Sequence, residues 1–161
     1  MRIIEKGDLV SFDTDLICHY GYCSDMSRSW LCGDKPSDEQ RRLYAAAFEQ
    51  IESNIAVLKA GRTFLEVAGQ CWPIPEEFLS NRYSVSMHGV GLADEYPSIK
   101  HAADVAGKAF YGVIKAGMTR CVASFIGSYG GREGVKLEEQ VIVTETGVER
   151  MSTYPYEIDW L

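Results

Sequence analysis

The sequence predicts an α+β domain built on a mostly antiparallel sheet. β-rich runs occupy both ends of the chain, and two segments with helical patterning separate them. Strands, then helices, then strands again is the order typical of α+β folds.

The first strands are expected in residues 7–31. The run "GDLVSFDTDLI" (7–17) has β-rich composition and partial alternation of apolar and polar residues. The run "GYCSDMSRSWL" (21–31) predicts the returning strand of a hairpin. "GDKPSDEQRRL" then interrupts the sheet.

Two helices are predicted next. Ser37 followed three positions later by Gln40 forms a capping-box pattern. Apolar residues follow it at helical spacing: Leu43, Ala46, Ala47, Ile51, Ile55 and Leu58. Gly61 is expected to close this helix at its C′ position. A shorter helix is expected from about Thr63 to Cys71, because Pro73 cannot continue it.

The rest of the chain predicts strands joined by glycine-rich segments. Residues 86–97 indicate a loop or a bulged strand, and residues 101–114 a short helix or an irregular insertion. The runs "MTRCVASFIGSYG" and "EGVKLEEQVIVTETG" are β-rich and predict two strands with a glycine-rich turn between them.

Composition narrows the class of protein. The chain has 161 residues, 46% of them hydrophobic, which is enough for one domain with a core. A net charge of −7 disfavours nucleic-acid binding. No apolar run reaches the roughly 18 residues of a membrane span, and the start of the chain lacks the apolar block of a secretory signal. The five cysteines form no CxxC pair, so we expect a cytoplasmic protein whose cysteines mostly pack as small apolar residues.

Three acidic residues stand out in the first hairpin. Asp13 and Asp15 share one strand face, because side chains alternate with period two, and the hairpin returns Asp25 beside them. Converging carboxylates form a site for a divalent cation. A solvated polar strand face is the alternative interpretation.

Later residues could join such a site. His88 lies between glycine-rich neighbours in "MHGVGL", where backbone can approach a ligand closely. Glu138 and Glu139 point to opposite faces of one predicted strand, so one carboxylate can enter a site while the other faces water or an ion pair. His19 and His101 are expected to be surface or turn residues.

Four ordered motifs resemble the pita-bread metallopeptidase family, which includes methionine aminopeptidase, aminopeptidase P, prolidase and creatinase. They are "GYCSDMSRSW", "HGVGL", "AGMTRCVASFIG" and "GVKLEEQVIVTETG". The resemblance implies a partial pita-bread domain over residues 1–161, the C-terminal portion of a catalytic domain, with the family's N-terminal domain absent. It implies divalent metal ions, two in the family, and a homodimer. The metal ligands that it implies are Asp13, Asp15, Asp25, His88 and Glu138.

Three departures from the family pattern bear on function. "DTD" replaces the usual Asp-x-Gly, and the peptidases' second His is missing, with Asp94 near its place. The third is Ala123, which stands where the family has a Glu ligand and should weaken or abolish one metal position.

The first two departures resemble one branch of the family, the dimethylsulfoniopropionate lyases. That branch implies β-elimination of dimethyl sulfide and acrylate from a small zwitterionic sulfonium substrate, with iron, zinc or manganese as the metal. It also implies Asp94 as catalytic base, and Tyr83 and His88 as substrate contacts. An Xaa-Pro peptidase or creatinase-like hydrolase, and a non-catalytic member of the fold, remain alternatives.

Overall fold

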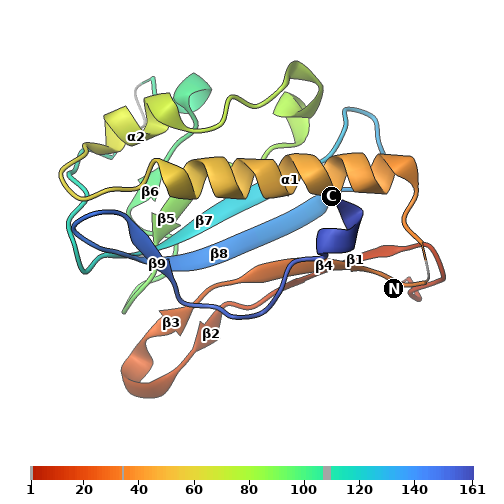
Figure 1. Cartoon of the computed structure of the whole chain (residues 1–161), viewed down its shortest axis with the longest axis horizontal. Coiled ribbons are helices and arrows are strands. Elements are labelled where there is room, and N and C mark those ends of the chain that lie inside the picture. The colour runs from red at the N-terminus through yellow and green to blue at the C-terminus, as the bar shows by residue number, and fades with distance from the viewer. Residues whose placement is uncertain (1, 34, 107–109) are drawn as a thin grey trace.

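The computed structural model describes residues 2–33, 35–106 and 110–161 and shows a curved antiparallel sheet with helices on one face (Figure 1). Five strands of the described chain form the main sheet in the order β6-β5-β7-β8-β9. These strands are β5 (Met87–Gly89), β6 (Ser98–Ile99), β7 (Thr119–Ile126), β8 (Val135–Val143) and β9 (Val148–Arg150). The predicted α+β class and antiparallel sheet are confirmed.

The predicted N-terminal hairpin is present and forms two short ribbons. β1 (Leu9–Asp13) pairs with β4 (Ser27–Leu31), so that Asp13 lies opposite Ser27. At the far end, β2 (Leu16–Ile17) pairs with β3 (Cys23–Ser24), and a short 3₁₀ turn at His19–Gly21 joins them. This tip projects away from the body of the molecule (Figure 1).

α1 (Asp38–Ala56) begins with the predicted capping box, and α2 (Phe64–Gln70) begins after Thr63 as expected, with a capping box that was not predicted. Ser37 and Gln40 form a reciprocal capping box, and Thr63 and Glu66 form a second one. These side chains bond the amide groups that a helix start leaves without partners.

The predicted end of the first helix is wrong. α1 ends at Ala56, and Gly61 instead donates its backbone N–H to the carbonyl of Ile114 with a φ of 90°. The Arg62 guanidinium lies 2.8 Å from the Val57 carbonyl and caps the helix from the side. A side-chain cap therefore replaces the glycine cap.

The remaining connections are irregular. Short 3₁₀ turns occur at Glu76–Asn81, Ala102–Asp104 and Ile158–Trp160. The segment 101–114, for which a short helix or an irregular insertion is expected, contains one such turn followed by irregular chain, and its residues 107–109 lie outside the described residues.

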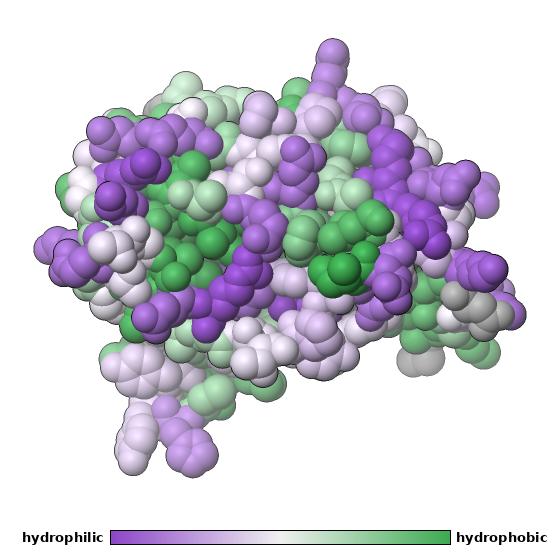
Figure 2. Space-filling view, in the orientation of Figure 1, coloured by the Kyte–Doolittle hydropathy of each residue, from purple (hydrophilic) through white to green (hydrophobic). Residues whose placement is uncertain are grey.

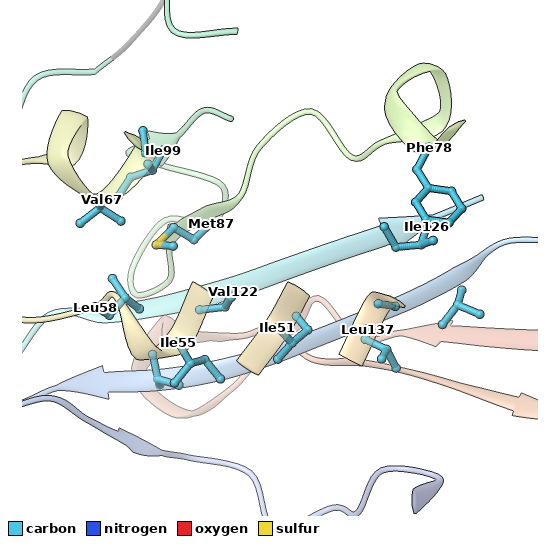
Figure 3. Close-up of a cluster of buried hydrophobic side chains, with 14 of the residues drawn as sticks. Ile51, Ile55, Leu58, Val67, Phe78, Met87, Ile99, Val122, Ile126 and Leu137 are labelled. Atoms are coloured by element: carbon cyan, nitrogen blue, oxygen red, sulfur yellow. The ribbon is translucent and has the colours of Figure 1, made fainter. Parts of the chain in front are cut away.

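The core lies between α1 and one face of the sheet. Ile51 and Ile55 of α1 lie next to Val122 of β7 and Leu137 of β8, and all four are buried (Figure 3). Because strand side chains alternate, Cys121 and Glu138 face away from this core. The opposite face of the sheet is thus available for polar chemistry.

Candidate metal centre

Four side chains from four segments converge on the sheet face away from α1. They are Asp25, which follows β3, His88 of β5, Cys121 of β7 and Glu138 of β8. One donor atom from each lies within 4.8 Å of the others. All four residues are buried, with at most 1% of their surface exposed.

Strand register explains why these residues meet. In the sheet Cys121 pairs with His88 on one side and with Gln140 on the other, and Glu138 pairs with Ala123. Gln140 also accepts a hydrogen bond from the backbone N–H of Asp25 at 3.1 Å. That contact fixes the hairpin to β8 and holds the Asp25 carboxylate over the sheet.

His88 is oriented toward the cluster. Its Nδ1 lies 3.2 Å from the Gly89 carbonyl, which can accept the ring N–H and leave Nε2 as the inward-facing nitrogen. Nε2 lies 3.2 Å from Asp25 Oδ2. Neither Nε2 nor Asp25 Oδ1 has a hydrogen-bond partner among the described residues, which is unusual for buried polar atoms.

A second group of donors shares Asp25. Its members are Asp13, Asp15 and Asp25, and one carboxylate oxygen of each lies within 4.8 Å of the others. Asp13 and Asp15 are exposed. The structure therefore brings together all five side chains that the resemblance implies as metal ligands, in two groups joined at Asp25.

Lys136 places a positive charge beside these acids. Its Nζ lies 2.7 Å from Glu138 Oε1 and 3.3 Å from Asp13 Oδ2. The Ser27 hydroxyl lies within hydrogen-bond distance of both carboxylates, 2.6 Å from Asp13 Oδ1 and 2.5 Å from Glu138 Oε2, and can donate its one hydrogen to either. Burial alone would lower the pKa of Lys136, but Glu138 and Asp13 raise it above its ordinary value.

The acids strongly perturb one another. Burial, reinforced by the negative charge of Asp25, raises the pKa of Glu138 to about 9 although Lys136 acts in the opposite direction. Burial also opposes ionisation of Asp25, but the adjacent His88 ring and Glu138 hold its pKa below the ordinary range. Without a further cation the cluster therefore retains protons, and a divalent ion would displace them.

Asp94 and Tyr83 lie at the rim. Asp94 Oδ1 is 3.8 Å from His88 Nδ1, and burial followed by repulsion from Asp25 raises the pKa of Asp94. The Tyr83 hydroxyl donates to Glu95 at 2.8 Å, and Lys136 Nζ lies 4.0 Å from the centre of the Tyr83 ring. Asp94, which the resemblance implies as catalytic base, therefore lies beside His88. Tyr83, which it implies as a substrate contact, lies beside Lys136.

Gly89 allows two backbone segments to approach each other. A Cβ at this position would clash with the Tyr96 carbonyl. Gly91 accepts a hydrogen bond from the Cys23 N–H at 2.7 Å and links the loop to β3.

The two glutamates of β8 separate as alternation predicts. Glu139 lies on the helix-facing side, where its carboxylate is 3.0 Å from the Arg28 guanidinium and accepts from the Tyr156 hydroxyl at 2.8 Å. The expected ion pair is present, with Glu139 only 1% exposed.

The histidines outside the cluster behave differently from each other. His19 is exposed, as expected. His101 lies at the start of the 3₁₀ turn Ala102–Asp104, as the turn alternative expects, but it is not a surface residue, because it is 5% exposed and its Nε2 lies 3.1 Å from the Tyr83 carbonyl. Sequence reasoning also missed Cys121, Lys136 and Gln140 as site residues, because their participation depends on strand register.

Comparisons with known proteins show which family this chain belongs to. The model of Metallopeptidase family M24 matches residues 1–145. This chain belongs to metallopeptidase family M24. The pita-bread fold of the family is confirmed by solved prolidases. The prolidase from Pyrococcus furiosus superposes with a TM-score of 0.75 at 27% identity, over 94% of this chain and 43% of that one. The prolidase from Pyrococcus horikoshii gives 0.77 at 25% identity, over 97% of this chain and 43% of that one.

Curated M24 relatives include enzymes of two reaction types. A dimethylsulfoniopropionate lyase DddP from Roseovarius nubinhibens is 40% identical over 97% of this chain, and one from Roseobacter denitrificans is 36% identical over 97%. An Xaa-Pro dipeptidase from Pyrococcus furiosus is 29% identical over 96% of this chain, and the matched region is 42% of the dipeptidase. The chain spans 35% of the length of each of the two lyases.

The described part of this M24 chain contains no helix that combines the length and apolar character needed to cross a membrane.

Proposed function

We propose that this chain carries the catalytic site of a metal-dependent carbon–sulfur lyase. The substrate is dimethylsulfoniopropionate, and the products are dimethyl sulfide and acrylate. The observation that carries the proposal is Asp94, a carboxylate with a raised pKa beside His88 at the rim of the donor cluster. The 36–40% identity to the two lyases supports the same reaction.

The donor set suits a divalent ion. Carboxylates, an imidazole and a thiol converge in a buried space where two polar atoms have no partner among the described residues. A bound ion of iron, zinc or manganese supplies Lewis acidity toward the substrate carboxylate. Asp25, His88 and Glu138 would hold it, with Asp13 and Asp15 on the exposed side.

Asp94 is proposed to remove the proton from the carbon next to the substrate carboxylate. The electron pair of that C–H bond forms the carbon–carbon double bond of acrylate. The carbon–sulfur bond breaks, and its electrons leave with neutral dimethyl sulfide. A carboxylate whose pKa is raised by burial and by Asp25 is a stronger base than an ordinary surface aspartate.

The sulfonium end would lie toward Tyr83 and Glu95. Lys136 already occupies one region over the Tyr83 ring, at 4.0 Å from its centre, so the sulfonium is expected on the remaining face. Cation–π attraction there contributes about 0.5–2 kcal/mol. The Glu95 carboxylate, bonded to the Tyr83 hydroxyl, adds a negative charge beside it.

The test is an assay for dimethyl sulfide in the headspace above the metal-loaded chain. We expect release from the native sequence and a loss of about 10²–10⁴-fold in Asp94→Asn, which can no longer accept a proton. Metal content should be unchanged in that variant. Asp38→Asn, an exposed acid in the first turn of α1, is the matched control and should keep full activity.

A hydrolase is the second candidate. The likeness to prolidases, with a TM-score of 0.75 for the Pyrococcus furiosus structure, favours it. Release of proline from Xaa-Pro dipeptides, with no dimethyl sulfide formed, would overturn the lyase proposal. Silence in both assays from a metal-loaded chain, unchanged by Ala123→Glu, would instead favour a non-catalytic binding module.

A further inference from the structure

We propose that Cys121 is a metal ligand, and that its thiolate completes a four-donor set with Asp25, His88 and Glu138 around one tightly held ion. This assignment deepens the proposed function, because it rests on the binding of a metal. It does not depend on which substrate the site takes.

The position of Cys121 favours ligation. It lies in the middle of β7 between His88 on β5 and Gln140 on β8, and it is fully buried. Its Sγ is within 4.8 Å of donor atoms of the other three residues. Bond lengths of tetrahedral sites imply ligand–ligand separations of roughly 3.3–3.8 Å, so an ion needs only a small contraction of the cluster.

Two buried atoms point independently to a ligand. His88 Nε2 and Asp25 Oδ1 have no hydrogen-bond partner in the described chain, although both residues are at least 99% buried. Leaving such atoms buried and unpaired is destabilising. An ion at the centre of the cluster would satisfy both.

Cys121 is the side chain through which β7 can contribute a donor to the cluster. Ala123 lies opposite Glu138 and has no donor atom, while Cys121 lies two residues earlier on the same strand face. A thiolate at 121 would therefore be the anionic ligand that β7 contributes.

The donor types indicate which ion is preferred. Thiolate and imidazole ligands favour zinc, iron or cobalt over magnesium and calcium. The outer group is less suited to a second ion, because Asp13 and Asp15 are exposed and the group contains no nitrogen or sulfur donor. We therefore expect a metal-to-chain ratio near one.

The test uses cobalt(II) as the only added ligand, under reducing conditions and without substrate. Titration of the native chain should produce a thiolate-to-cobalt charge-transfer band in the near ultraviolet that saturates near one equivalent. Cys121→Ser should abolish the band and weaken cobalt binding at least tenfold. Cys32→Ser, at a half-buried cysteine outside the cluster, is the matched control and should keep both.

The native chain alone can overturn the proposal, so it does not depend on the folding of a variant. Saturation with cobalt and no thiolate band would show that Cys121 is not a ligand, while the lyase proposal would stand on its own assay. Survival of the band in Cys121→Ser would have the same meaning. A native chain that binds no cobalt would overturn this ligand assignment together with the metal dependence of the proposed function.

Discussion

His101 is a buried base that the fold holds in its neutral form. Burial lowers its pKa, the nearby charges of Arg82 and Lys100 act in the same direction, and the Tyr83 carbonyl and Asp104 oppose them. The imidazole thus connects the backbone of Tyr83, at the rim of the candidate site, to the 3₁₀ turn that begins at Ala102.

This residue makes stability depend on pH. Because its folded pKa is depressed, the unfolded chain binds the proton first as the pH falls through about 6.5, so stability decreases below that pH and is recovered above it. The contribution of His101 to the free energy of unfolding changes by at most about 1.4 kcal/mol per pH unit. Urea unfolding at about pH 7.5 and about pH 5.5 measures the difference in that free energy.

Two histidine variants separate this effect from the other titrating groups. We expect His101→Gln to show a smaller loss of stability between the two pH values than the native chain. His19→Gln, at an exposed position, should lose as much as the native chain. Equal pH dependence in all three proteins would contradict the prediction.

Single residues differ in how far the sequence reveals their role. Asp25, His88 and Glu138 stand in ordered motifs, and Asp13 shares a predicted hairpin with Asp25, so their convergence is predictable. Cys121 also lies in one of the motifs, but the resemblance implies no ligand at its position, and a cysteine in an apolar strand is most often a packing residue. Its nearness to three donors comes from its pairing with His88 and Gln140, which depends on segments far away in the chain.

At the scale of elements, β4 is held against β8 by a buried ion pair. The Arg28 guanidinium is 3.0 Å from Glu139, and the two side chains are 2% and 1% exposed. Arg28 also donates to the carbonyls of Glu138 and Tyr154, at 2.5 Å and 2.9 Å. Its guanidinium carbon lies 4.0 Å from the centre of the Tyr156 ring.

Removing one charge of this pair should be costly. We expect Glu139→Gln to lower the free energy of unfolding by about 3–5 kcal/mol, because Arg28 would remain buried without a counter-charge. The measurement is urea denaturation followed by circular dichroism. Glu77→Gln, which removes one partner of the exposed Arg42, should cost less than about 1 kcal/mol. Similar costs for both variants would show that burial does not govern the pair.

Local signals account for the elements that sequence reasoning predicted well. Capping boxes mark the starts of α1 and α2, and β-rich runs between glycine-rich turns mark β7 and β8. The end of α1 was misjudged because Arg62, a residue beyond the helix, caps it. The sequence equally gives no sign that Arg28 in "SRSW" is buried, since its partner is more than a hundred residues away.

At the scale of the whole molecule, the projecting hairpin tip leaves apolar side chains in solvent. Leu16, Ile17, Tyr20 and Tyr22 are 59%, 77%, 95% and 55% exposed. In Figure 2 this projection carries pale and purple residues with some green ones, and the body shows green patches among purple surface. Exposed apolar groups that gather in one place favour contact with another surface.

We expect the chain to self-associate through this tip, consistent with the homodimer that the family resemblance implies. Sedimentation velocity should show an average mass that rises with concentration. Ile17→Lys should weaken association at least tenfold, because a charge would be buried at the contact. Leu65→Lys, at an exposed apolar position of α2, is the control and should leave association unchanged. A native chain that stays monomeric at all concentrations would contradict this prediction.

The alternation of side chains along β8 also has a consequence for how this protein can change. Odd-numbered positions such as Leu137 and Val141 belong to the core, whereas Lys136, Glu138 and Gln140 face the candidate site. Selection for a new reaction can therefore act on every second residue of one strand while the intervening ones preserve folding. Such a division would let relatives with the same backbone diverge into lyases and peptidases without rebuilding their interiors.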